Sequence, residues 1–403
     1  METNKGFSPV KVAGRLASIC ILSLHVVFLA VPDALADSAS KAQRLFNRLA
    51  GYPLPLNDPR RSQMQSLIEQ GRVLDAARIA SQDDNFLNLT VRQFAAPMSN
   101  RAESPRVPLN DFIAMFIGTT RDNRDARELL SGNYLYIGNS NDPSFRSSCT
   151  SPSCSYSPSP MATQAHFTAI DRTNLAKHLL RIQPQRPDIS DAAGVLTSYA
   201  WAESFFSAGT NRRATAYALQ EFLCTSIQEM ADTTLSDYRV RRDVDRAPGG
   251  DANTYQTECR GCHTGMDGLS GAWAHFDYNP DNRILQSAGI RGKMNQNNAV
   301  FPGGHITVDN SWVNLFTRNQ NAALQWRGSM TGRGVSEFGT MLANSGAFSK
   351  CMAKRAFFRI CHREPESSEA ALINGLKEKF EASGYKLRAL LEETATLPVC
   401  LGE

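Results

Sequence analysis

The pentapeptide Cys259-Arg260-Gly261-Cys262-His263 constrains this 403-residue chain more than any other stretch. Two cysteines three positions apart, with a histidine directly after the second, form the attachment pattern for a c-type haem. One helical turn aims both thiols at the two vinyl groups of the porphyrin, and the adjacent imidazole can then bind the iron. The alternatives are a dithiol redox pair and half of a zinc site. No second Cys/His pair follows closely, so the pattern favours one covalent haem c held by Cys259, Cys262 and His263.

Residues 1–36 have the features of a cleaved signal peptide. Three basic residues precede a nearly uninterrupted apolar run from Leu16 to Val31, and Ala34-Leu35-Ala36 supplies a small-residue cleavage site before Asp37. The alternative is a retained membrane anchor, for which the apolar run is short. We therefore expect an exported protein, periplasmic or secreted, with no stable membrane span after cleavage.

The other cysteines indicate disulfides. Cys20 leaves with the signal peptide, and six cysteines then remain outside the pentapeptide. An even number in an oxidising compartment is typical of disulfide bonds, whereas free buried thiols are the alternative. Cys149 and Cys154 are close enough to pair locally. Two further bridges are expected, and the sequence leaves their connectivity open among Cys224, Cys351, Cys361 and Cys400.

Charge and patterning define the expected organisation. The net charge is +4, and +3 without residues 1–36, with no clustered Lys/Arg stripe, so no nucleic-acid partner is expected. Hydrophobic periodicity predicts a mainly α protein. We expect a helical N-terminal domain at 37–235, a c-type-cytochrome-like haem domain with a long distal loop at 236–345, and a C-terminal helical module at 346–403 that packs on the haem domain.

Individual helices are also predicted. Asn110-Asp111 precedes an apolar stretch and indicates a capped, buried helix. The segment from Arg212 to Met230 has helical spacing throughout. In the last 60 residues two amphipathic helices are expected, with core positions at Leu372, Leu376 and Phe380 on the first and at Leu387, Leu390 and Leu391 on the second. Gly265, Gly268 and Gly271 are expected to let the chain leave the haem helix.

The run CRGCHTGMDGLSGAWAHFD, from Cys259 to Asp277, resembles the hallmark of a known group of proteins. These are secreted bacterial cytochrome-c-like proteins of the planctomycete and myxobacterial type, in which C-x-x-C-H is followed by Met-Asp and Phe-Asp. Residues 129–137, 194–224 and 348–400 are similar to other segments of that group, in the same order. The chain departs from the pattern at Gly268, where proline is usual, and lacks the proline-rich run after Cys224. The resemblance implies a periplasmic or secreted c-type cytochrome and no settled reaction.

The second axial ligand decides between two functions. A distal thioether would close the iron to substrate and suit electron transfer to an unknown redox partner protein, whereas an open site would suit a peroxidase- or oxidoreductase-like haem enzyme. Met266 follows the axial histidine too closely, and His275 is better suited to a propionate or backbone contact. Met294 lies in the glycine-rich loop between residues 279 and 311 and is the predicted distal ligand, with His305 as the runner-up. Electron transfer is therefore the favoured function.

Overall fold

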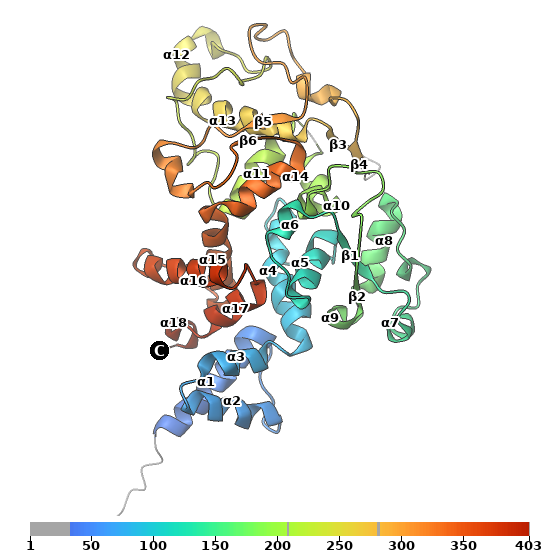
Figure 1. Cartoon of the computed structure of the whole chain (residues 1–403), viewed down its shortest axis with the longest axis vertical. Coiled ribbons are helices and arrows are strands. Elements are labelled where there is room, and N and C mark those ends of the chain that lie inside the picture. The colour runs from blue at the N-terminus through green and yellow to red at the C-terminus, as the bar shows by residue number, and fades with distance from the viewer. Residues whose placement is uncertain (1–32, 208, 280–282, 403) are drawn as a thin grey trace, which may run out of the picture.

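The computed structural model describes residues 33–207, 209–279 and 283–402, and within them the protein is mainly helical. This confirms that the fold class is mainly α, whereas the c-type-cytochrome-like haem domain stays a prediction. The few strands form three separate two-stranded antiparallel sheets (Figure 1). Most of the predicted signal peptide lies outside the described residues, and its predicted cleavage site falls in the first turn of α1 (Asp33–Ala50). No described helix is both long and apolar enough to cross a membrane.

The N-terminal part, blue to green in Figure 1, holds most of the helices and one strand pair. After α1 its elements are α2 (Pro59–Glu69), α3 (Val73–Ala80), α4 (Arg92–Ala95), α5 (Asp111–Arg121), α6 (Glu128–Ser131), β1 (Leu135–Gly138), α7 (Pro143–Ser148), α8 (Pro160–Ile170), α9 (Leu175–His178), β2 (Leu179–Ile182), α10 (Tyr199–Phe205) and α11 (Arg212–Leu223). Strand β1 pairs with β2, with Leu135 opposite Ile182.

The middle segment lies at one end of the molecule and the C-terminal helices lie beside the N-terminal ones (Figure 1). The middle segment comprises α12 (Ala252–Thr254), α13 (Arg260–Ser270), β3 (Phe276–Asn279), β4 (Arg283–Gln286), β5 (Ser311–Val313), β6 (Thr331–Arg333) and α14 (Gly334–Asn344). The last four helices are α15 (Gly346–Cys361), α16 (Ala370–Ala382), α17 (Leu387–Ala395) and α18 (Pro398–Leu401).

Helix α5 is the predicted capped, buried helix. The side chain of Asn110 accepts a hydrogen bond from the backbone N–H of Ile113, which satisfies a free donor of the first turn. Every residue from Asp111 to Thr120 is buried, and Phe112 stacks with Trp201 of α10. The prediction for this helix is confirmed.

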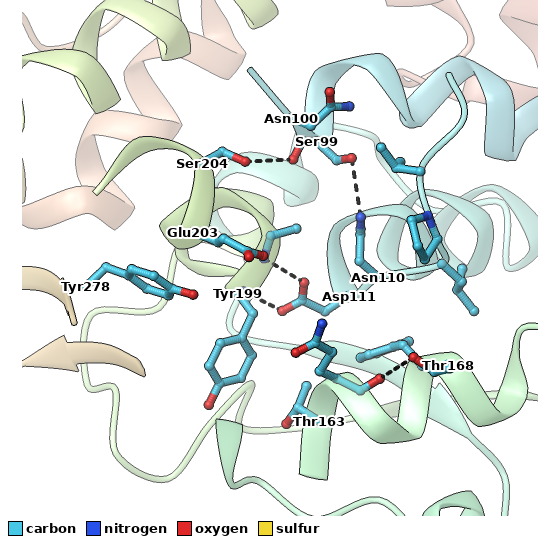
Figure 2. Close-up of a pocket in the computed structure, with 16 residues that line it drawn as sticks. Ser99, Asn100, Asn110, Asp111, Thr163, Thr168, Tyr199, Glu203, Ser204 and Tyr278 are labelled. Carbon is cyan, nitrogen blue, oxygen red and sulfur yellow. Dashed lines mark hydrogen bonds between the residues drawn. The ribbon is translucent and has the colours of Figure 1, made fainter. Parts of the chain in front are cut away.

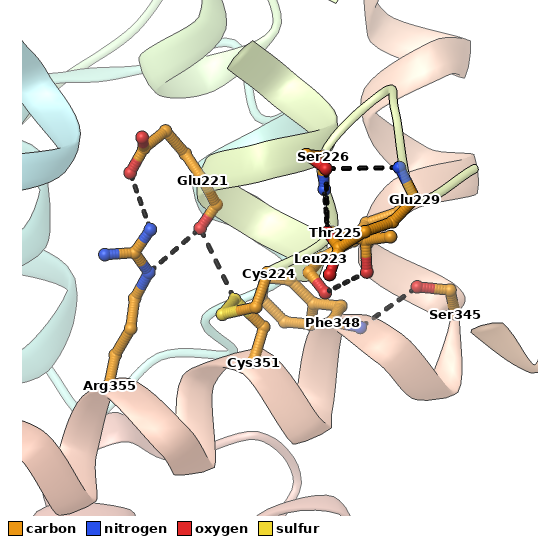
Figure 3. Close-up of a disulfide and its surroundings, with 10 residues drawn as sticks. All are labelled: Glu221, Leu223, Cys224, Thr225, Ser226, Glu229, Ser345, Phe348, Cys351 and Arg355. Carbon is orange, nitrogen blue, oxygen red and sulfur yellow. Dashed lines mark hydrogen bonds and ion pairs between the residues drawn. A yellow bond between two sulfur atoms is a disulfide. The ribbon is translucent and has the colours of Figure 1, made fainter. Parts of the chain in front are cut away.

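Helix α11 ends earlier than predicted. It stops at Leu223, because Cys224 adopts a left-handed conformation with φ 51° and forms a disulfide with Cys351 of α15 (Figure 3). The extension of this helix to Met230 was therefore wrong. The same bridge, together with Cys149–Cys154 and Cys361–Cys400, confirms the prediction of three disulfides and supplies the pairing that the sequence left open.

The two predicted C-terminal helices are α16 and α17. Leu387, Leu390 and Leu391 of α17 are buried as expected. On α16 the buried positions are Ile373, Leu376 and Phe380, while Leu372 is 36% exposed, so the predicted face was wrong by one residue at its first position.

The C-terminal helices contact both of the other parts of the chain. Helix α15 packs against α1, α4 and α11 as well as against α14, and α17 packs against α1, α3 and α5. One continuous hydrophobic core includes residues from all three predicted segments. The three segments therefore share their main core.

Candidate functional site

The Cys-x-x-Cys-His motif lies at the start of α13. A π-helical turn, Tyr255–Cys259, leads directly into this helix. Tyr255 is buried with Val240 and Val244 in a small cluster separate from the main core, and Cys259 packs against that cluster. The backbone around Cys259 is therefore held in place by apolar contacts that are local to this segment.

Among the described cysteines, only Cys259 and Cys262 are outside a disulfide. Both are partly exposed. The thiol of Cys262 donates to the carbonyl oxygen of Ile227 at 3.7 Å. Burial, with a smaller contribution from Cys259, raises the pKa of the Cys262 thiol. The structure therefore presents two separate thiols one helical turn apart.

The glycines of α13 serve close packing. A Cβ on Gly265 would lie 2.2 Å from the ring of Phe316, and one on Gly268 would lie 2.8 Å from the carbonyl oxygen of Val313. Gly271, just after α13, meets the carbonyl oxygen of Ser311 in the same way. Because α13 continues to Ser270, the expectation that the chain leaves the helix was wrong for Gly265 and Gly268, whereas Gly271 does follow the last residue of the helix. The three glycines form a face that packs directly against residues 311–316.

His263 is one turn before a buried carboxylate on α13. Its side chain is 26% exposed, and its Nδ1 lies 3.7 Å from Oδ1 of Asp267. Metal-bound histidines commonly direct the second ring nitrogen at a carboxylate or carbonyl, which fixes the tautomer and the ring orientation. With Nδ1 facing Asp267, Nε2 is the nitrogen that remains for a metal.

Asp267 belongs to a buried charge network. Its side chain has no exposed surface. The carboxylate accepts hydrogen bonds from Nη2 of Arg212 at 2.8 Å and from the backbone N–H of Arg241 at 3.0 Å. Arg212 also forms a two-pronged ion pair with Asp243, at 2.6 and 2.8 Å. Burial alone would raise the pKa of Asp267, but the charge of Arg241 and the hydrogen bonds from Arg212 hold this pKa well below its usual range. The network therefore contains two arginines and two carboxylates.

Met294, the predicted distal ligand, lies in a 3-10 turn and is 1% exposed. Its Sδ is 3.9 Å from Nη1 of Arg241, which also donates to its carbonyl oxygen. A chain of contacts thus runs from Nδ1 of His263 through Asp267 and Arg241 to Met294. This chain of contacts begins at Nδ1 and not at Nε2, the nitrogen that remains for a metal. Its role as an iron ligand stays a prediction.

The other three distal candidates occupy different surroundings. His305 pairs with Arg241 in an isolated β-bridge, and its Nε2 lies 3.5 Å from Nη1 of Arg239. Met266 is partly buried on α13. His275 is partly buried, and its main-chain carbonyl oxygen accepts a hydrogen bond from the N–H of Ser287; the expected contact of its side chain stays a prediction.

The residues present fit a covalent haem. In the part of the chain that the structure describes, no three His, Cys, Asp or Glu side chains converge to hold a metal ion by protein ligands alone. A haem needs no such cluster, because the porphyrin supplies four of the iron ligands and the protein adds an axial one. The two separate thiols and the partly exposed His263 match that requirement.

Sequence reasoning missed Arg212 and Arg241. Asp243 follows Arg242 directly in the sequence, yet it pairs with Arg212, which is 31 residues away. Comparison of the chain with known protein families, curated proteins and solved structures finds no match. The resemblance to secreted cytochrome-c-like proteins therefore stays a prediction.

Proposed function

We propose that the chain is an exported c-type cytochrome that carries one haem c and transfers electrons to a redox partner protein. In this proposal Cys259 and Cys262 hold the haem through thioethers, and His263 is the axial ligand. The observation that carries it is the division of the cysteines: the described cysteines outside the motif are all paired, and the two thiols of the motif are not.

The chain's own residues have distinct tasks in this proposal. When bound, the haem would supply reversible one-electron exchange. Asp267 would hold the His263 ring in one orientation through Nδ1. Arg212 and Arg241 keep the Asp267 carboxylate ionised, so that it remains a hydrogen-bond acceptor. The loop that includes Ile227 covers one side of the motif.

Export is supported by two features. Disulfides persist in oxidising compartments and are rare in the cytosol of mesophiles, and three are present here. The predicted signal peptide at residues 1–36 agrees with them. We therefore propose a periplasmic or secreted location, which is also where thioether attachment of haem takes place in bacteria.

The haem proposal is tested with two double variants. Wild-type protein from an exporting host that matures c-type haem should keep its colour through acid-solvent extraction. Cys259→Ala with Cys262→Ala should lose it. Cys149→Ala with Cys154→Ala removes two cysteines and a disulfide elsewhere, and this control should keep the covalent haem. Colour that extracts freely from the wild type would overturn the proposal.

A second candidate function is a haem enzyme with an open distal iron site. The observation that favours it is the contact of Met294 with Arg241, because a thioether held there is not free to bind iron. Under the electron-transfer proposal, Met294→Ala should remove the far-red sulfur-to-iron band and produce a high-spin haem, while Met266→Ala should change neither. If the wild type lacks this band and binds cyanide readily, the enzyme is the correct function. If it is low-spin without the band, His305→Ala tests the runner-up ligand.

A further inference from the structure

A cavity of about 320 Å³ lies between the N-terminal helices and the β3–β4 hairpin. Its walls come from the start of α5, from α8, from α10 and from Tyr278 of β3 (Figure 2). This volume is at the lower end of the range of pockets that bind small organic molecules. The cavity contains no residue of the Cys-x-x-Cys-His motif, so its chemistry is separate from the proposed haem.

The described residues that line the cavity combine two carboxylates with aromatic rings. Asp111 and Glu203 supply the carboxylates, and Phe167, Tyr199 and Tyr278 supply the rings. None of the described lining residues is lysine, arginine or histidine. Carboxylates and the faces of aromatic rings both attract cations. The lining therefore favours a positively charged ligand and disfavours an anion.

Asp111 is the buried carboxylate of the site. It accepts hydrogen bonds from the backbone N–H groups of Phe112, Tyr199 and Ala200, but no basic side chain among the described residues lies within ion-pair distance of it. The charge of Arg186, which stacks on the Tyr199 ring and pairs with Asp188, also acts on Asp111. Burial raises the pKa of Asp111, and the three backbone N–H groups and the charge of Arg186 oppose this rise only in part, so a cation in the cavity would stabilise the ionised carboxylate.

Glu203 is the exposed carboxylate of the site. It projects from α10 on the side from which Tyr278 enters (Figure 2). No described basic side chain forms an ion pair with it. Burial, with a further contribution from the charge of Glu203, raises the pKa of Tyr278 to about 12, so the Glu203 carboxylate lies close enough to act on this ring. Both carboxylates line the cavity, Glu203 from α10 and Asp111 from the start of α5.

We propose that this cavity binds a small organic cation, an ammonium group that carries one apolar or aromatic substituent. The ammonium lies between Glu203 and Asp111, and the substituent occupies the apolar part of the cavity lined by Phe167. The proposal does not depend on the haem. It names a ligand class for the N-terminal helical region, whose role the sequence left open.

The first experiment is calorimetric titration of the full-length mature protein with three probes of one shape. Benzylammonium, benzyl alcohol and benzoate differ mainly in charge. Benzylammonium should bind at least about ten-fold more tightly than benzyl alcohol, since two carboxylates in a partly desolvated site favour a cation. Benzoate should not bind. If the alcohol binds equally well, or if none of the three binds, the proposal is wrong.

Two variants locate the binding site. Glu203→Gln should weaken the binding of benzylammonium about three- to five-fold, which is the effect of one exposed ion pair. The affinity for benzyl alcohol should not change. Glu378→Gln, an exposed glutamate on α16 far from this cavity in sequence and fold, is the matched control and should change neither affinity. Equal benzylammonium affinity in both variants would place the binding elsewhere and overturn the assignment.

Discussion

The buried charge network at α13 leads to a quantitative prediction for Asp267→Asn. This substitution keeps the shape of the side chain and removes its charge. Arg212 would retain its pair with Asp243, but Arg241, whose side chain is 2% exposed, would lose the carboxylate 3.7 Å from its Nη2. A buried cation without a compensating carboxylate costs about 3–5 kcal/mol. We expect the free energy of unfolding to fall by that amount.

The measurement is guanidinium denaturation followed by circular dichroism at pH 7. Because small proteins have stabilities of about 5–15 kcal/mol, a loss of this size should move the midpoint clearly, with the slope unchanged. The pKa of Asp267 is depressed in the folded state, so its stabilising contribution is present above the unfolded pKa of a carboxyl group and is lost as the pH falls through the folded value. The difference between wild type and variant should therefore persist at pH 5.

Asp243→Asn is the matched control. Its carboxylate is 11% exposed and, among the described residues, forms an ion pair only with Arg212, so its removal should cost only about 1–2 kcal/mol. A loss below about 1 kcal/mol for Asp267→Asn, or equal losses for the two variants, would refute the claim that Asp267 balances two buried arginines.

Two further stability predictions follow from buried groups elsewhere. Burial raises the pKa of Glu221 from 4.5 to about 7, so as the pH rises this carboxyl group ionises in the unfolded chain before it does in the folded protein. The free energy of unfolding of the wild type should therefore fall between pH 4.5 and 7, by up to about 3 kcal/mol. Glu221→Gln should flatten this pH dependence in urea titrations, and an unchanged dependence would contradict the prediction. Chain entropy predicts that opening the 127-residue loop of Cys224–Cys351 by a double alanine substitution costs about 5 kcal/mol and opening the 5-residue loop of Cys149–Cys154 about 2 kcal/mol. The reverse order in thermal unfolding would count against the entropic explanation.

Local patterns were sufficient for some of the fold. The cap at Asn110 and the continuous apolar run after it predicted α5 correctly, because both signals are contained within a few residues. The short spacing between Cys149 and Cys154 allowed their pairing to be predicted for the same reason. The other four cysteines lie far apart along the chain, and only the packing of α15 against α11 determines that Cys224 pairs with Cys351.

Tertiary contacts explain the errors. The helical spacing continues past Cys224, yet the helix ends there because the backbone turns to reach α15. The glycines of α13 suggested a helix end, since glycine is a poor helix former, but a chain segment packed against Gly265 requires the absence of a side chain at that position. In both cases the deciding partner is a segment distant in sequence, and no local pattern describes it.

The charge network at the candidate site also depends on contacts between distant segments, which local sequence patterns do not predict. Taken separately, Arg212, Arg241 and Asp267 are residue types expected at the solvated surface, because charged side chains are rarely buried unless they are paired. Their burial becomes favourable only when α11, the loop before α12 and α13 meet and their charges balance. The predicted boundary between residues 235 and 236 separates Arg212 from both of its carboxylate partners. Residues 236–345 alone therefore do not contain the charge balance of the candidate site, because Arg212, which holds the Asp267 carboxylate beside His263, lies in the N-terminal helical region.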